Sequence, residues 1–125
     1  GGNISILYSL LGSKSSINTK DKIIFIEDLD EYLYHIDRMM FNLKRNGYFE
    51  KVKGIIVGSM SDMHDNEIPF GQNEVQIITE IAKENNIPIA FEFPAGHQKD
   101  NRTLILGKKV DFEVNENEII LRFKD

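Results

Sequence analysis

The sequence contains no cysteine. The chain therefore has no disulfide framework, no thiolate metal site and no cysteine nucleophile, and this composition suits a reducing compartment. No apolar run approaches the roughly 20 residues that a membrane-spanning helix needs. No basic region followed by an apolar stretch marks a signal peptide. We expect a cytoplasmic protein that has no membrane partner.

Positive charge is in the minority, since the formal net charge is −5. This acidic balance disfavours nucleic acid and anionic membrane surfaces as partners. The composition, 41% hydrophobic and 28% charged, is ordinary for a globular protein, and 125 residues suit one domain. The chain begins with Gly-Gly-Asn and no methionine, so we expect it to be part of a longer polypeptide.

Apolar periodicity predicts helices that alternate with strands. One stripe contains Leu33, Ile36, Met40 and Leu43, and a second contains Val75, Ile78 and Ile81. The expected elements are helix 4–11, strand 22–26, helix 31–46, strand 52–60, helix 73–85, strand 87–93, a short strand 104–106 and a hairpin of 110–114 with 118–123. This order predicts an α/β domain whose strands are parallel in its first part and antiparallel at its end.

Two positions combine a chemically active side chain with the end of a predicted strand. Glu27 directly follows strand 22–26, at the sheet edge where ligands of α/β folds bind. Its neighbours Asp28 and Asp30 are interpreted as charges favoured at the start of the following helix. His97 follows a Pro-Ala-Gly turn, and imidazole is the usual proton-transfer group near neutral pH. A surface-loop histidine remains the alternative at that position.

A carboxylate and an imidazole suggest two members of a catalytic triad. No Gly-x-Ser-x-Gly elbow supplies the nucleophile, and the nearest candidates, Ser59 and Ser61, are interpreted as structural or as neighbours of the substrate. His35 lies in a predicted helix. His64 lacks a partner histidine at metal-ligand spacing, so we expect neither a metal nor a cofactor.

Residues 24–39 (Ile-Phe-Ile-Glu-Asp-Leu-Asp-Glu-Tyr-Leu-Tyr-His-Ile-Asp-Arg-Met) resemble a signature of the LD-carboxypeptidases. This family includes muramoyltetrapeptide carboxypeptidases and microcin-immunity peptidases. Three more segments match the family's pattern in the same order. They are residues 1–5 (Gly-Gly-Asn-Ile-Ser), 54–58 (Gly-Ile-Ile-Val-Gly) and 94–97 (Pro-Ala-Gly-His). The last segment is followed by the matching residues Asn101, Leu104 and Gly107. The resemblance covers the chain from its first residue to about residue 110, which is most of its length.

The resemblance implies a two-domain serine peptidase. Its C-terminal domain, a layered β/β/α swivelling-type domain with a mixed sheet and a C-terminal hairpin, would be residues 1–125. The family pattern assigns Glu27 as triad acid and His97 as general base, with Asn3 and Glu31 as substrate contacts. Glu31 is also the rival triad acid. The nucleophilic serine and the oxyanion hole would come from an N-terminal domain that this chain lacks, so we expect the chain alone to be inactive.

The family's usual substrate is the amide before a terminal D-alanine in murein tetrapeptides, cleaved during cytoplasmic peptidoglycan recycling. The resemblance also implies a homodimer in the parent protein. Three alternatives stay open, which are a microcin-type peptidase acting on peptidyl nucleotides, a non-catalytic α/β interaction module and a metal-dependent hydrolase. In the interaction module Glu27 and His97 would lie far apart.

Overall fold

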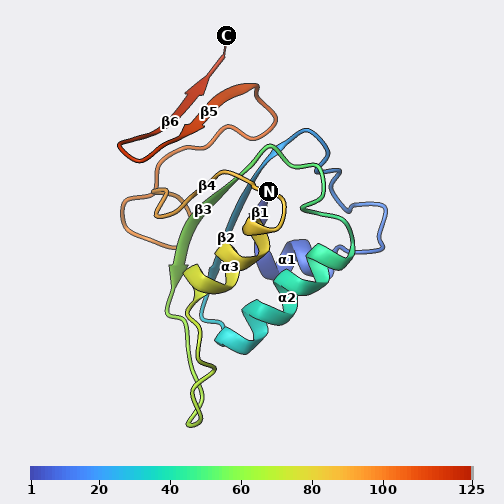
Figure 1. The fold of residues 1–125 in the computed structure, drawn as a ribbon, viewed down its shortest axis with the longest axis vertical. Coiled ribbons are helices and arrows are strands. Elements are labelled where there is room, and N and C mark those ends of the chain that lie inside the picture. The colour runs from blue at the N-terminus through green and yellow to red at the C-terminus, as the bar shows by residue number, and fades with distance from the viewer. Residues whose placement is uncertain (125) are drawn as a thin grey trace.

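A computed structural model describes residues 1–124. The elements in chain order are β1 (Gly2–Asn3), α1 (Ile4–Ser9), β2 (Ile23–Leu29), α2 (Leu33–Arg45), β3 (Gly54–Ser61), α3 (Glu74–Lys83), β4 (Ile89–Ala90), β5 (Val110–Val114) and β6 (Ile119–Phe123). The first four strands form one parallel sheet in the order β1-β2-β3-β4, and β5 pairs with β6 antiparallel in a separate hairpin (Figure 1).

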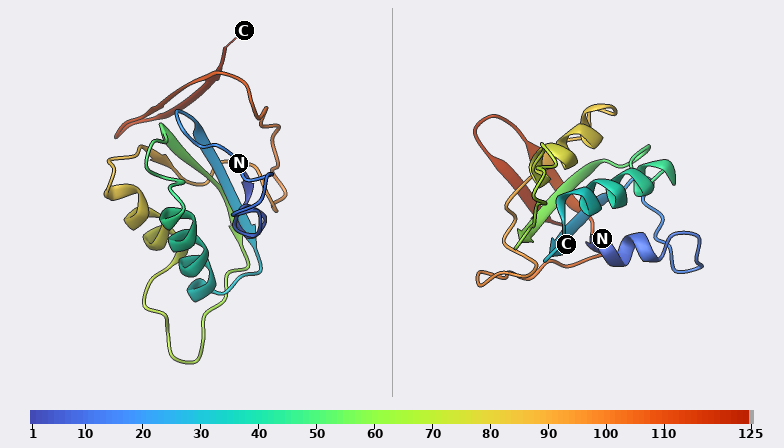
Figure 2. Two further views of the ribbon diagram at one scale, coloured as in Figure 1. Left: turned by 90° about the vertical axis from the view of Figure 1, so that its right-hand side faces the viewer. Right: turned by 90° about the horizontal axis from the view of Figure 1, so that it is seen from below.

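The helices cover one face of the parallel sheet (Figure 2). Alternate residues of β2 and β3, such as Ile24 and Ile55, join the buried cluster that the helices complete. The helices contribute Ile4, Leu7, Ile36, Met39, Met40, Leu43, Ile77, Ile78, Ile81 and Ala82. Burial of these apolar side chains is the main force that holds the layers together. Within residues 1–124 no helix is both long and apolar enough to cross a bilayer.

The opposite face of the sheet is covered by the chain that follows β4. Phe93 packs edge-on against Phe25 of β2, with ring centroids 6.3 Å apart. Backbone hydrogen bonds run from Phe93 to Val57 and from Ser59 to Ala95, and they fasten this segment to β3. A Cβ at Gly58 would lie 2.4 Å from the Ala95 carbonyl oxygen, so only glycine admits this close approach. The sheet therefore has a helical layer on one face and an irregular layer on the other.

The hairpin and the carboxyl ends of the strands lie at opposite ends of the molecule. Figure 1 shows the hairpin (red) at the top, while the loop after β3 (green to yellow) extends from the bottom. This loop connects β3 to α3, whose N-terminus has a capping box between Asn73 and Gln76. The carboxyl ends of the parallel strands are therefore remote from the hairpin.

The predicted fold class is confirmed, with the parallel and antiparallel strands in two sheets. Several details of the prediction are wrong. Strand β2 extends through Glu27 to Leu29, so Glu27 lies inside the strand, and β4 has only two residues. Residues 104–106 form no strand, and β1 was not predicted. Val75 is 42% exposed, because α3 turns Ile77 toward the core instead.

Asp37 of α2 provides a test of the packing between α2 and α3. Its partial burial, and then the charge of Glu80 on α3, raise its pKa above the ordinary value. Ionised Asp37 therefore destabilises the folded state at neutral pH, and this cost disappears as pH falls through the raised pKa. We expect Asp37→Asn to raise the free energy of unfolding at neutral pH by at most about 1 kcal/mol, because the group is partly solvated.

Urea unfolding of both proteins at several pH values measures this difference. The higher free energy of unfolding of Asp37→Asn should disappear in acid, where Asp37 is protonated in the unsubstituted chain. Glu116→Gln, on the exposed turn of the hairpin, is the control and should give no comparable gain. If Asp37→Asn raised the free energy of unfolding by the same amount at all pH values, the ionised form of Asp37 would not be the cause, and the explanation would be contradicted.

Candidate active site

Glu27 and His97 form a hydrogen-bonded pair, although 70 residues separate them in sequence. The distance from Glu27 Oε2 to His97 Nδ1 is 2.7 Å. The carboxylate is buried, with 7% of its side chain exposed, whereas the imidazole is 50% exposed. The structure therefore brings together the two side chains that sequence analysis selected as acid and base.

The strand geometry explains why Glu27 faces the histidine. Successive side chains of a strand point to opposite faces of the sheet. Ile26 and Asp28 point to the side of the helices, so Glu27 points to the side covered by the chain after β4. A register irregularity between Ile26 and Asp28, where β2 pairs with β3, places this carboxylate at a local bend.

The loop that carries His97 is shaped by Gly96. Gly96 has φ = +115°, a conformation that other residues rarely adopt. A Cβ at this position would lie 2.5 Å from Ser59 Oγ and 3.0 Å from Glu27 Oε2. The Gly96 amide donates to Asn101 Oδ1, and Ser61 Oγ donates to the His97 carbonyl at 2.8 Å. The histidine is therefore fixed through its backbone on both sides.

The pair has the arrangement of a general base with its orienting acid. An ionised carboxylate only accepts hydrogen bonds, so the proton between the two groups resides on Nδ1. The second ring nitrogen, Nε2, is then unprotonated in the neutral ring and free to take a proton. Within the described part of the chain, the side-chain hydrogen bond of His97 is made through Nδ1, and Nε2 of His97 has no hydrogen bond. This geometry can activate a nucleophile that approaches from outside the domain.

Asp28 is the functional neighbour whose role sequence analysis misjudged. It was expected at the start of the helix after β2, but its side chain reaches the start of α1. Asp28 as a whole is only 2% exposed. Its carboxylate accepts a hydrogen bond from Asn3 Nδ2 at 2.9 Å, and it accepts two more from the amide and the hydroxyl of Ser5 at 3.0 and 2.9 Å. It also accepts from its neighbour, the Leu29 amide. These bonds join β1 and α1 to the end of β2.

Asn3 and Glu31 lie close to this network. Asn3 caps α1 by accepting from the Ile6 amide at 3.1 Å, so both polar atoms of its side chain have partners within the domain. Glu31 accepts from Ser5 Oγ at 3.0 Å and pairs with His35 Nδ1 at 2.7 Å. Of the two candidate acids, Glu27 is therefore the one that contacts His97.

Neither of the two candidate serines of the domain is hydrogen-bonded to the imidazole. Ser61 is bonded to the His97 backbone, and Ser59 is buried beneath the loop. His64, the other histidine outside a helix, pairs with Asp30 instead of joining a metal site. Among residues 1–124 no three histidine, aspartate or glutamate side chains gather as metal ligands.

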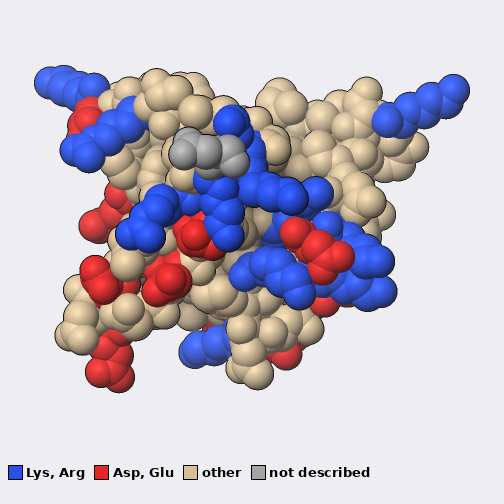
Figure 3. Space-filling model, turned by 90° about the horizontal axis from the view of Figure 1, so that it is seen from above, with Lys and Arg blue, Asp and Glu red and all other residues tan. Residues whose placement is uncertain are grey.

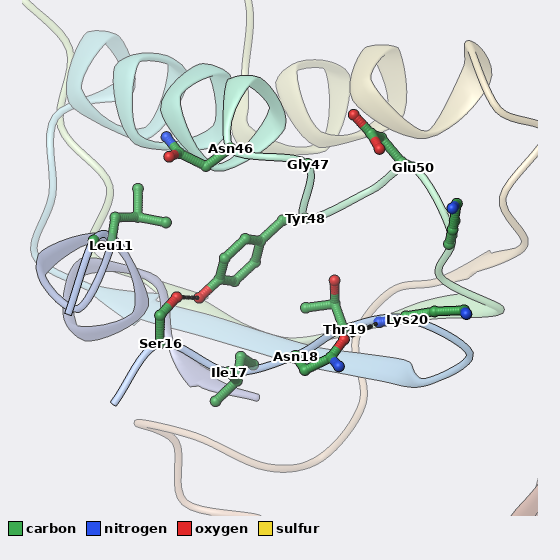
Figure 4. A pocket seen from close by; sticks show the side chains of 12 residues that line it. Leu11, Ser16, Ile17, Asn18, Thr19, Lys20, Asn46, Gly47, Tyr48 and Glu50 are labelled. Carbon is green, nitrogen blue, oxygen red and sulfur yellow. Dashed lines mark hydrogen bonds between the residues drawn. The ribbon is translucent and has the colours of Figure 1, made fainter. Parts of the chain in front are cut away.

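Two hollows of the surface are lined by residues other than Glu27 and His97. One, between the chain after α1 and Tyr48, encloses the hydrogen bond of Ser16 with Tyr48 (Figure 4). A second lies under the hairpin and is bordered by Lys22, Lys53, Lys108, Lys109 and Lys124. Figure 3 shows a gathering of positive charge over this end. Within the pair, the imidazole of His97 is half exposed to solvent, whereas the carboxylate of Glu27 is buried.

Comparison with known proteins identifies what this chain is similar to. A family model described as the LD-carboxypeptidase C-terminal domain matches residues 1–112. The probable murein peptide carboxypeptidase of Bacillus subtilis is 32% identical in an alignment of 125 positions that covers 97% of this chain and 38% of the relative. The microcin C7 self-immunity protein MccF of Escherichia coli is 32% identical in an alignment of 123 positions that covers 94% of this chain and 34% of that protein.

Solved structures agree with the sequence relatives. The muramoyltetrapeptide carboxypeptidase of Oxalobacter formigenes superimposes with a TM-score of 0.85 at 25% identity, covering 99% of this chain and 44% of that one. An MccF-like protein of Bacillus anthracis gives a TM-score of 0.77 at 25% identity, covering 98% of this chain and 38% of that one. The chain thus spans less than half the length of these relatives.

Gly96 offers a direct test of the site geometry. We expect Gly96→Ala to lower the free energy of unfolding by about 2–4 kcal/mol, since overpacking adds to the strain of a positive φ. Gly107→Ala is the matched control, because Gly107 has φ = +86° and nothing within 4 Å of an added Cβ. Denaturant unfolding measures both, and equal losses would contradict the close contact of Gly96 with Ser59 and Glu27.

Proposed function

Because this chain belongs to the LD-carboxypeptidase family through its match to the C-terminal domain, we propose that it supplies the acid and the base of a serine carboxypeptidase. Glu27 is the acid, His97 is the base, and a separate N-terminal domain provides the nucleophilic serine. The observation that carries the proposal is the 2.7 Å contact between Glu27 Oε2 and His97 Nδ1, in an imidazole that is half exposed to solvent.

The chemistry follows from this geometry. His97 Nε2 takes the proton of the serine hydroxyl as the oxygen attacks the carbonyl carbon before the terminal residue. Glu27 holds the ring in the Nδ1–H tautomer and stabilises the imidazolium that forms. Backbone amides of the N-terminal domain hold the oxyanion. His97 then protonates the leaving amine, and water releases the acyl group by the same route in reverse.

The proposed substrate is a murein tetrapeptide that loses its terminal D-alanine. Relatives in Bacillus subtilis and Pseudomonas aeruginosa are named as a probable murein peptide carboxypeptidase and a murein tetrapeptide carboxypeptidase. The substrate contacts in this domain are Asn3 and Glu31. Glu31 is acidic and already pairs with His35 and Ser5, so it suits a substrate with a cationic centre such as diaminopimelate better than an anionic one.

A second candidate is a microcin-immunity activity. It is favoured by the 32% identity to MccF, which has been solved in complex with aspartyl sulfamoyl adenosine. In that case the substrate is a peptidyl nucleotide, whose nucleotide part leaves with the amine, and an aromatic side chain stacking on the base would favour this activity. Such a group would have to come from outside this domain or from its exposed tyrosines, Tyr32 and Tyr34.

The remaining parts of the proposal concern the parent protein. We propose that it acts in the cytoplasm, where peptidoglycan fragments are recycled, and that it is a homodimer. The non-catalytic alternative required Glu27 and His97 to lie far apart, and the observed contact gives it no support.

The chain alone is expected to release no D-alanine from L-Ala-D-Glu-meso-diaminopimelate-D-Ala, because a triad without its serine retains little hydrolysis. Fusion to the N-terminal domain of the Bacillus subtilis relative should restore release. The measurement is D-alanine formed per enzyme under identical conditions. Activity of the unfused chain would contradict the division of the triad between two domains.

Variants of the fused protein separate the two candidate acids. We expect Glu27→Gln to lower kcat by about 10⁴-fold, the effect of amidating the triad acid in serine proteases. Glu31→Gln should act mainly on KM, because its side chain does not contact His97. Both changes replace a carboxylate by its amide, so each is the control of the other. A larger loss of kcat in Glu31→Gln would exchange their roles.

A further inference from the structure

Ser59 carries a buried hydroxyl that has no hydrogen-bond partner. It lies near the end of β3 and is 8% exposed, and its Oγ is the only buried side-chain polar atom left unpaired within residues 1–124. A buried hydroxyl without a partner has lost its hydrogen bonds to water and gained none in return. Such groups are rare in folded proteins and often belong to functional sites.

The Ser59 hydroxyl and the Glu27 carboxylate border the same small space. The point where a Cβ of Gly96 would stand is 2.5 Å from Ser59 Oγ and 3.0 Å from Glu27 Oε2. Glycine at position 96 keeps this space free, and position 97 is the histidine of the pair. Ser59 therefore lies beneath the loop of the base and beside the acid.

Ser59 is not placed to be the missing nucleophile. A nucleophilic serine must reach both the substrate and the unbonded Nε2 of His97. The Ser59 hydroxyl is enclosed beneath the loop, and the nitrogen of His97 that faces the interior, Nδ1, is already bonded to Glu27. Its position favours an action on Glu27 instead.

The Glu27 carboxylate has acceptor positions to spare. A carboxylate accepts about four hydrogen bonds, whereas in the described chain the Glu27 side chain accepts one, from His97. A buried carboxylate with few donors is poorly stabilised. The backbone amide of Ser59 already donates to the Ala95 carbonyl, so the strand fixes the backbone of Ser59 while no hydrogen bond holds its hydroxyl.

We propose that Ser59 is a positioning residue for the Glu27–His97 pair. Rotation about its Cα–Cβ bond brings the hydroxyl onto the Glu27 carboxylate as a second donor beside His97. This donor fixes the plane of the carboxylate, so that Oε2 stays aligned with Nδ1, and it stabilises the negative charge that faces the imidazolium. The inference rests on the proposed function, because it gives Ser59 a role only through the pair.

The test follows the Nδ1 proton of His97 in the chain itself, labelled with ¹⁵N-histidine. Exchange of this proton with water requires the bond to Glu27 to open, so its rate reports how firmly the pair is held. We expect Ser59→Ala to exchange at least about tenfold faster than the parent chain. Ser59→Cys keeps a similar volume but is a weak donor, and it should also exchange faster, whereas Ser59→Thr retains the hydroxyl and should exchange slowly.

Ser16→Ala is the matched control, since it removes a hydroxyl bonded to Tyr48 outside the site, and it should leave the exchange rate unchanged. Unaltered exchange in both Ser59→Ala and Ser59→Cys would overturn the proposal. A higher unfolding midpoint for Ser59→Ala would overturn it too, because that result is expected of a hydroxyl that is merely unpaired.

One further variant distinguishes failure of this inference from failure of the proposed function. Glu27→Gln should accelerate exchange of the His97 proton, because the charged acceptor is lost. If it does so and the Ser59 variants do not, the pair is real and only the role of Ser59 is overturned. If Glu27→Gln has no effect, the pair does not exist in solution, and both proposals are overturned.

Discussion

The site depends on a carboxylate that is buried in a sheet and must be compensated there. Glu27 is 7% exposed, and an isolated ionised carboxylate in that position would strongly destabilise the fold. His97 provides the compensation at 2.7 Å. If the loop after β4 moved away from β2, the Glu27 carboxylate would therefore be exposed to solvent or left buried without its partner. The same contact that stabilises the buried carboxylate also orients the imidazole for proton transfer.

Two adjacent carboxylates on one strand carry out two different tasks. Glu27 points to the side of the loop, and Asp28 points to the side of α1, where Asn3 and Ser5 donate to it. The alternation of side chains along a strand separates them. Asp28 fixes the N-terminal strand and helix against β2, so the strand end that carries Glu27 has support on both faces. A rigid frame of this kind is what a catalytic acid–base pair requires.

The sequence predicted much of this arrangement because its signals are local. The apolar run before Glu27 and the stripe around Ile36 and Met40 specify buried elements, and these lie where expected. The Pro-Ala-Gly-His turn likewise indicated a shaped loop. These patterns depend only on residues close together in the chain, so the helices, strands and candidate pair could be located without a structure.

The errors come from contacts between distant segments. Strand β2 continues through its acidic residues because Asn3, Ser5 and His97, far away in sequence, stabilise them. The role of Asp28 was missed for that reason. Val75 was assigned to the core because apolar periodicity identifies the apolar side of a helix. Periodicity does not show which residues at the border of that side are exposed to solvent, as Val75 is. Ser59 was considered only as a structural residue or a neighbour of the substrate, because its unpaired hydroxyl is a property of packing that the sequence does not show.

The most direct test of the account is the tautomer of His97 in the folded chain. The ¹⁵N chemical shifts of the two ring nitrogens, measured where the ring is neutral, identify which one carries the proton. The account predicts a proton on Nδ1, bonded to Glu27, and an unprotonated Nε2 able to act as a base. A proton on Nε2, with Nδ1 unprotonated, would contradict it, because Glu27 would then have no donor and His97 no basic nitrogen facing outward.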